Sequence, residues 1–171
     1  MARTMSMALV SLLIASPCVH PLYGDSKNTR REFEIIYKRI AEASNSRDYD
    51  KIEAAFISLL SPDFTMRTLD GETIDVKHEI DTVKSNLKGI LSNEIEFEIV
   101  CVSGTDDEAS ATVVWKNSGI VRDADGKISR VDQGVIERDD WTRTNGGWRL
   151  KHTEQLKQLY LFVDGKTKSR T

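Results

Sequence analysis

The chain has 171 residues, of which 39% are hydrophobic. That is long and apolar enough for one domain with a substantial core. Its 24 lysine and arginine residues and 27 aspartate and glutamate residues are dispersed, so we expect no nucleic acid as a partner. No apolar run reaches the roughly 20 residues that span a bilayer, so we expect no membrane span in the mature chain.

Residues 1–24 differ in composition from the rest of the chain. Arg3 is the only charged residue among them, and residues 7–15 form a short apolar run. A positive start, an apolar run and a polar exit are typical of a secretory signal peptide. We therefore expect cleavage after Gly24 and a periplasmic or secreted protein. The alternative is a cytoplasmic protein in which the same residues form an apolar helix or a disordered leader.

The mature chain is predicted to begin with a helix. Residues 25–31 are polar and are interpreted as a flexible lead-in, which places the start of the domain at residue 32. Apolar side chains then recur from Phe33 to Ile40 at the spacing of an amphipathic helix, with Tyr37 on the same stripe. This helix is expected to end near Asn45.

Two further helices and a strand are predicted next. Asp48 or Asp50 can cap the second helix, and Pro62 ends it because the residue before a proline avoids helical geometry. Residues 64–69 alternate as a strand does, with Phe64 and Thr68 on one face. Asp75 is the expected cap of the third helix.

The second half of the sequence predicts long antiparallel strands. They cover residues 94–102, 109–121, 128–143 and 148–163. The last would be about 50 Å long at ~3.3 Å per residue, which implies a bent or strongly twisted sheet. Helices followed by such strands favour a single α+β domain over residues 32–163, with a polar tail at 164–171. A cavity between a curved sheet and its helices is a natural ligand site.

The last two strands are predicted to form a hairpin around Asn145 and Gly146. An Asn-Gly pair favours a two-residue turn in which both residues have positive φ. Such a turn would pair Arg143 with Trp148, Trp141 with Leu150, and Asp139 with His152. A three-residue loop would place Asp140 opposite His152 and turn Trp141 outward, so we prefer the shorter loop.

Three sequence stretches resemble the nuclear transport factor 2-like superfamily, and its SnoaL-like members in particular, which are related to polyketide cyclases and ketosteroid isomerase. They are residues 43–50, Ser61-Pro62-Asp63-Phe64 with Asp70-Gly71, and residues 141–150. The resemblance implies a cystatin-like, cone-shaped antiparallel sheet wrapped around N-terminal helices, often as a homodimer. It does not fix an activity, because this superfamily includes isomerases, cyclases, dehydratases, hydrolases and non-catalytic modules.

Two enzymes of this kind were compared residue by residue. The helix tyrosine of ketosteroid isomerase falls at Ile40 and its base near Thr68, and neither side chain can do that chemistry. Tyr37, one turn away, could replace the tyrosine. The tryptophan-arginine-aspartate run of limonene epoxide hydrolase resembles Trp148-Arg149, but Leu150 follows where a carboxylate is needed. Both activities are disfavoured.

His152 and Asp139 are the candidate catalytic residues. Opposite each other on neighbouring strands, they could form a hydrogen bond that fixes the imidazole as a general base. A structural role for the same bond is the favoured interpretation, since buried polar groups need partners. The histidines and acidic residues show no metal spacing such as HExxH, so we expect neither a metal nor a cofactor.

Three functions remain open. The first is binding of a small, mostly apolar molecule in the cone, by Tyr37, Phe64, Thr68, Trp115, Trp141 and Trp148. The second is a lyase, isomerase or hydrolase that uses the pair of Asp139 and His152. The third is a non-catalytic dimerisation or interaction module. We rank binding first because the predicted inner face is rich in aromatic residues and poor in polar ones.

Overall fold

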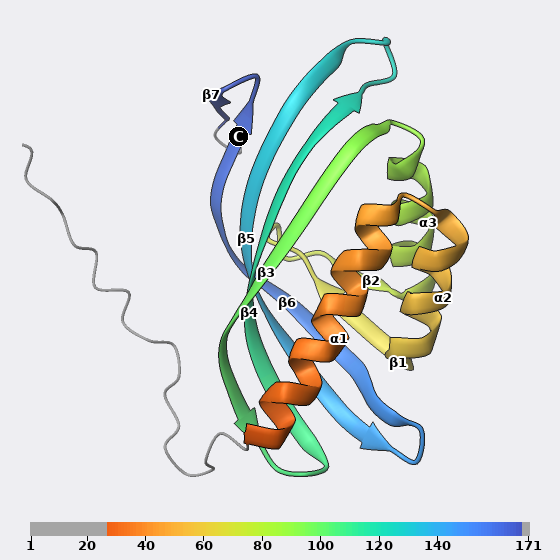
Figure 1. The fold of residues 1–171 in the computed structure, drawn as a ribbon, viewed down its shortest axis with the longest axis vertical. Helices are drawn as coiled ribbons and strands as arrows, with labels where there is room; N and C mark the ends of the chain where they lie inside the picture. Colours follow the sequence, from red (N-terminus) through yellow and green to blue (C-terminus); the bar gives the residue numbers. More distant parts are fainter. Residues whose placement is uncertain (1–26, 169–171) are drawn as a thin grey trace, which may run out of the picture.

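Three helices cover one face of a long, bent sheet (Figure 1). The computed structural model describes residues 27–168, so the predicted signal peptide at residues 1–24 lies outside the described residues. The helices are α1 (Lys27–Ser46), α2 (Tyr49–Leu59) and α3 (Val76–Leu87). The strands are β1 (Leu60–Arg67), β2 (Thr73–Asp75), β3 (Ile90–Gly104), β4 (Glu108–Arg122), β5 (Ile128–Thr144), β6 (Gly147–Val163) and β7 (Lys166–Thr167).

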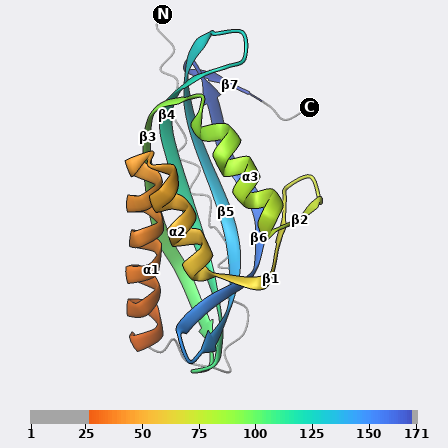
Figure 2. The same ribbon diagram turned by 90° about the vertical axis from the view of Figure 1, so that its right-hand side faces the viewer.

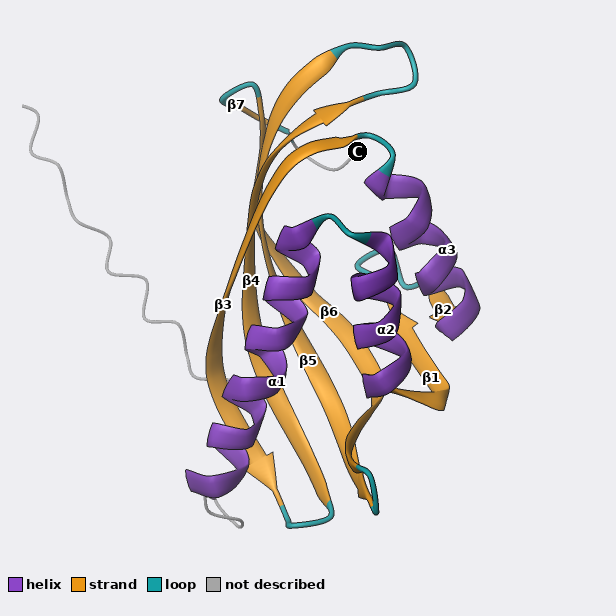
Figure 3. Cartoon of the chain, turned by 45° about the vertical axis from the view of Figure 1, so that its right-hand side comes forward, coloured by secondary structure: helices purple, strands orange, loops and turns teal. Residues whose placement is uncertain are grey.

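The strands form one mixed sheet in the order β2-β1-β6-β5-β4-β3, with β7 paired to β6. Every pair is antiparallel except β1 with β6, which run parallel. Figures 2 and 3 show the three helices side by side in front of the sheet. The predicted α+β architecture, a curved sheet around N-terminal helices, is confirmed. Within residues 27–168, no helix has both the length and the hydrophobicity needed to cross a membrane.

Helix α1 begins earlier than the sequence predicts. Residues 27–31, interpreted above as part of a flexible lead-in, are helical. Thr29 is buried, and the Arg30 guanidinium donates a 2.7 Å hydrogen bond to the carbonyl oxygen of Ile99 on β3. The helix thus extends through this polar segment, where the Arg30 side chain has a partner on the sheet.

The caps of α2 and α3 are those predicted from the sequence. The Asp48 side chain accepts hydrogen bonds from the backbone N–H groups of Asp50 and Lys51, and Asp75 accepts one from His78. Each carboxylate thereby satisfies N–H groups that the first helical turn leaves unpaired. The chain passes from α2 directly into β1 at Leu60, whereas the predicted strand started at residue 64.

The β5–β6 hairpin has the predicted two-residue loop, but the loop has a different backbone conformation. Arg143 pairs with Trp148 and Trp141 with Leu150, as expected. Positive φ occurs at Gly147 (104°) and not at Asn145 or Gly146, so the expected turn with two positive φ angles is wrong. The Thr144 hydroxyl binds inside the loop, accepting from the Gly146 N–H and donating to the Gly147 carbonyl.

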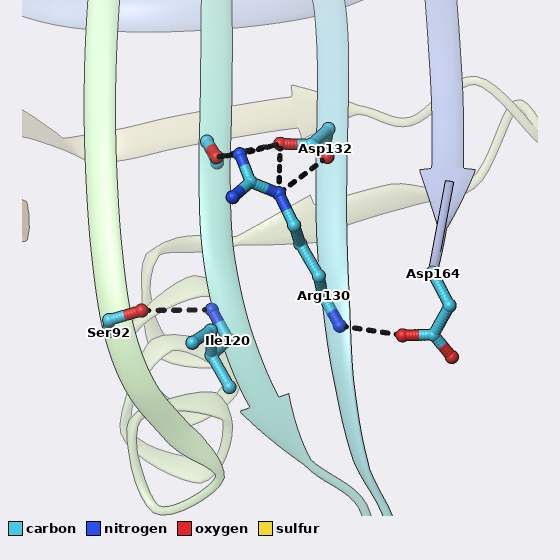
Figure 4. Close-up of polar contacts among 6 residues, drawn as sticks. Ser92, Ile120, Arg130, Asp132 and Asp164 are labelled. Carbon is cyan, nitrogen blue, oxygen red and sulfur yellow. Dashed lines mark hydrogen bonds and ion pairs between the residues drawn. The ribbon is translucent and has the colours of Figure 1, made fainter. Parts of the chain in front are cut away.

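The β4–β5 hairpin extends beyond the helices, and polar contacts join its strands to their neighbours (Figures 1 and 4). The Arg130 guanidinium binds the Asp132 carboxylate at 3.0 Å and the Ser118 hydroxyl at 2.9 Å. The backbone N–H of Arg130 donates to Asp164 at 2.9 Å, and that of Ile120 donates to Ser92 Oγ at 3.1 Å. These bonds link β3, β4, β5 and the turn after β6.

The core fills one end of the space between α1 and the sheet. Phe33 lies between Trp141 and Trp148, with each pair of ring centroids 5.2 Å apart. Small residues of β4, Ala109 and Ala111, are buried against them, which lets the large rings approach the sheet. Toward the other end, the side chains leave a cavity.

Candidate functional site

A cavity of about 380 Å³ lies between the helices and the concave face of the sheet. All three helices and strands β1, β3, β4, β5 and β6 contribute to its wall. The apolar part of the lining includes Phe56, Phe64, Met66, Ile95, Trp115 and Leu150. The volume falls in the range of small-molecule sites, which are mostly apolar with a few placed polar groups.

Strand β5 supplies the polar floor of this cavity. Gln133, Glu137 and Asp139 all line it, as does Val135 between them. They share one face because side chains alternate along a strand, and β5 pairs with β4 without any register shift. Two carboxyl groups two residues apart therefore enter the same apolar space. Glu79 of α3 adds a third from the helical side.

Asp139 is buried and held by two hydroxyl groups. The Tyr37 hydroxyl donates to Asp139 Oδ2 at 2.7 Å, and the Thr153 hydroxyl donates to Oδ1 at 2.6 Å. The indole N–H of Trp141 in turn donates to the Tyr37 oxygen at 3.1 Å. This chain joins α1, β5 and β6 through the interior. It fixes the position of the carboxylate at the cavity wall.

Solved structures share this arrangement of helices and sheet. A nuclear transport factor 2-like superfamily protein from Salmonella enterica is 16% identical, with 77% of this chain and 92% of that chain covered at a TM-score of 0.61. Hexachlorocyclohexane dehydrochlorinase LinA-type3 from Novosphingobium barchaimii is 11% identical, with 80% and 90% covered at 0.63. A domain of unknown function with a cystatin-like fold from Nostoc punctiforme is 13% identical, with 79% and 80% covered at 0.58.

The chain has the nuclear transport factor 2-like fold. The predicted resemblance is thereby confirmed at the level of the fold. No family model matches the sequence, and no curated protein sequence is similar to it. Identities of 11–16% show a shared fold and carry no activity from one protein to another.

Burial raises the pKa values of the acidic groups inside the nuclear transport factor 2-like cone. Loss of hydration raises the pKa of Asp139 to about 6, although the hydrogen bonds from Thr153 and Tyr37 oppose the shift. Burial also raises the pKa of the Tyr37 phenol, and the charge of Asp139 adds to this effect. Tyr37 therefore stays protonated and acts as a donor to Asp139 across the neutral pH range.

The pKa of Glu137 is raised further than that of Asp139. Burial and the neighbouring charge of Asp139 raise its pKa to about 8, while the Gln155 amide, which donates to Oε1 at 3.0 Å, opposes the shift. The charge of Glu79 acts on Glu137 in the same direction as that of Asp139. Burial raises the pKa of Glu79 as well. With no ligand bound, Glu137 is mainly protonated at neutral pH.

His152 does not pair with Asp139, so the predicted dyad is wrong. The register of β5 and β6 shifts between Trp141 and Asp140, leaving Lys151 without a partner in a β-bulge. Asp139 consequently lies opposite Thr153. The His152 ring places Nδ1 2.8 Å from the hydroxyl of Thr65 on β1, and His152 does not line the cavity.

The cone places the six predicted ligand-binding residues in three different environments. Tyr37, Phe64 and Trp115 line the cavity. Trp141 and Trp148 belong to the core around Phe33 and do not reach the cavity wall, which corrects their assignment to the ligand site. Thr68 follows the end of β1 and does not line the cavity either, because its backbone turns toward Glu72.

Sequence reasoning missed Glu137, Glu79, Thr153 and Gln155. The signal for Glu137 was present, since alternation backward from Trp141 places Asp139 and Glu137 on the same face. Thr153 and Gln155 could not be found in this way, because the bulge at Lys151 reverses the alternation of β6. Among residues 27–168, no three His, Cys, Asp or Glu side chains are grouped so as to hold a metal ion.

Proposed function

We propose that this domain binds a small, largely apolar molecule in the cavity of its cone. The observation that carries the proposal is a cavity of about 380 Å³ walled by aromatic and aliphatic side chains with carboxyl groups on its floor. Apolar walls favour burial of an apolar ligand, at roughly 25 cal/mol per Å² removed from water. The few polar groups would fix the orientation of that ligand.

A neutral fluorescent probe, N-phenyl-1-naphthylamine, tests whether the cavity accepts such a molecule. We expect its emission to rise on mixing with the purified protein. Ser44→Phe would place a ring in the cavity, because Ser44 of α1 lines it. Ser46→Phe, at the exposed end of the same helix, is the matched control. Binding that is absent in the wild type, or unchanged in Ser44→Phe, would refute the proposal.

The second candidate is an acid–base enzyme that acts in the same cavity. It is favoured by two neighbouring carboxyl groups whose environments separate their pKa values, about 6 for Asp139 and about 8 for Glu137. Near pH 7 one would be mainly a carboxylate and the other mainly an acid, the pairing that proton transfer to and from a substrate requires. In this scheme Asp139 removes a proton from the substrate and Glu137 donates one.

Hydrogen–deuterium exchange at the acidic C–H groups of 2-tetralone, followed by NMR in D₂O, tests this chemistry without knowledge of the substrate. A positioned base contributes about 10²- to 10⁴-fold to such a step. We expect faster exchange with the wild type and with Asp140→Asn, whose side chain binds Ser110 instead of facing the cavity. Asp139→Asn should return the rate to background, and acceleration that survives this change would exclude Asp139 as the base.

Two further predictions concern the export of the protein and its assembly into a homodimer. Export rests on the composition of residues 1–24. Expression of the full chain in a bacterial host, followed by fractionation and intact-mass measurement, should give a periplasmic protein that lacks these residues. Homodimerisation, implied by the resemblance, would appear in light scattering as twice the mass of one chain. Retention of residues 1–24, or a monomer at high concentration, would refute the respective prediction.

A further inference from the structure

We propose that the ligand of this cavity carries a protonated amine beside its apolar body, and that the amine is held by the carboxylate of Glu137. This inference rests on the proposed ligand-binding function and specifies the chemical class of the ligand. It follows from the charges, the hydrogen-bonding groups and the aromatic rings that line the cavity.

The lining of the cavity carries negative charge without a positive partner. Glu79, Glu137 and Asp139 reach the wall from α3 and β5, and no lysine, arginine or histidine of residues 27–168 lines it. Burying a carboxylate in an apolar space without a positive partner costs free energy. This cost raises the pKa of Glu137. A ligand cation placed among them would offset it, whereas an anionic ligand would increase it.

The acceptors of the cavity are also incompletely satisfied. Glu137 Oε1 accepts a hydrogen bond from Gln155, while no hydrogen bond within residues 27–168 reaches Oε2. On the neighbouring strand, the buried Oδ1 of Asn117 has no donor within the described chain and belongs to the same lining. An ammonium group has N–H donors and no acceptor, so it supplies what Glu137 lacks. A charge-assisted hydrogen bond of this kind is stronger than a neutral one.

Aromatic rings complete the environment for a cation. Tyr37 and Trp115 both line the cavity, with ring centroids 5.7 Å apart. Ring faces attract cations, and they also provide apolar surface for the body of the ligand. The residues 27–168 offer no three-residue metal-binding group, so an organic cation fits these carboxyl groups better than a metal ion.

Three probes that share one ring system and differ in charge test the inference. They are 1-naphthylmethylamine, 1-naphthalenemethanol and 1-naphthoic acid, titrated calorimetrically into the purified protein near pH 8. We expect the amine to bind about tenfold more tightly than the alcohol, and the acid to bind most weakly. If no probe binds, the proposed function fails. If the alcohol or the acid binds as tightly as the amine, this inference fails and the proposed function stands.

A pair of variants locates the group that recognises the amine. Glu137→Gln keeps the shape of the side chain and removes its charge, so we expect the amine to bind only as tightly as the alcohol. Glu72→Gln, in the exposed turn between β1 and β2, should leave both affinities within about twofold of the wild type. An amine preference that persists in Glu137→Gln would overturn the assignment.

The pH dependence of amine binding is measured on the wild type, so this test does not depend on whether Glu137→Gln folds. The charged groups that face Glu137 are Asp139 from its own strand and Glu79 from α3, both acidic. Raising the pH from about 6 to about 8 increases the ionised fraction of Glu137 and should strengthen amine binding, while alcohol binding should not strengthen. Amine binding that weakens over this range would contradict the proposal, because it would show that a protonated Glu137 is the form required.

Discussion

Asp139 lies opposite Thr153, and the Thr153 hydroxyl donates a 2.6 Å hydrogen bond to the Asp139 carboxylate. One residue of β6 causes this pairing: Lys151 bulges out of the ladder, so Leu150 and Thr153 both face inward although they are three residues apart. The carboxylate at the cavity wall is therefore held by two hydroxyl groups, and the imidazole of His152 is directed to β1.

His152→Ala should leave ligand binding intact. The imidazole contacts Thr65 and does not line the cavity, so we expect the affinity for 1-naphthylmethylamine to stay within about twofold of the wild type. Thr153→Val, which removes a donor from Asp139, is the comparison and should raise the pKa of Asp139. NMR titration of the aspartate and calorimetry would measure both effects. A tenfold loss of affinity in His152→Ala would place the imidazole in the site.

Tyr37→Phe should destabilise the protein by about 1–3 kcal/mol, because it leaves Asp139 and the Trp141 indole each without a buried partner. Tyr49→Phe is the matched control, since the Tyr49 hydroxyl bonds only to Glu53 one turn away on a more exposed helix. Its cost should be within about 0.5 kcal/mol. Urea denaturation of the wild type and both variants gives the free energies of unfolding. Equal losses in Tyr37→Phe and Tyr49→Phe would argue against the buried hydrogen-bond chain.

Glu137→Gln should change how stability depends on pH. The folded-state pKa of Glu137, about 8, lies above its ordinary value of 4.5, so between these values the folded protein binds more protons than the unfolded chain. Its contribution is therefore fully present below about pH 4.5 and is lost as the pH rises toward 8. Melting temperatures across this range should fall less steeply in Glu137→Gln than in the wild type or Glu72→Gln. Parallel curves would exclude a raised pKa.

Gly147→Ala should cost more stability than Gly146→Ala. Gly147 has a φ of 104°, which an L side chain resists by about 1–2 kcal/mol. A Cβ on Gly146 would lie 3.8 Å from Thr144 Oγ1, an ordinary contact, so we expect a change within about 0.5 kcal/mol. The denaturant midpoints of the two variants measure these losses of stability. A larger loss in Gly146→Ala than in Gly147→Ala would indicate the turn expected from the Asn-Gly pair.

Much of the fold follows from local patterns in the sequence. The cap positions Asp48 and Asp75, the inward face of β4 and the two-residue hairpin loop all depend on neighbours a few residues away. Such features are readable because each follows from helical spacing, strand alternation or capping.

The site was less predictable because it depends on breaks in those patterns. Strict alternation along β3 would place Cys101 on the same face as Ile99, but the register shifts after Ile99, and Val102 is the next buried residue. Lys151 has the same effect in β6 and separates His152 from Asp139. Bulges add one residue without a sequence signal of their own, and each one turns the following side chains to the other face.

Side chains of the β5–β6 hairpin form hydrogen bonds with α1, and these bonds join residues that are far apart in the sequence. Glu32 accepts hydrogen bonds from the side chains of Arg143 and Trp148, which are 111 and 116 residues away, and Tyr37 meets Asp139 after 102 residues. Closing such long loops slows folding. During synthesis, the bonds of Glu32 to the last hairpin therefore cannot form until β6 has left the ribosome. Until then Phe33 of α1 also lacks the two indole rings, Trp141 and Trp148, between which it packs.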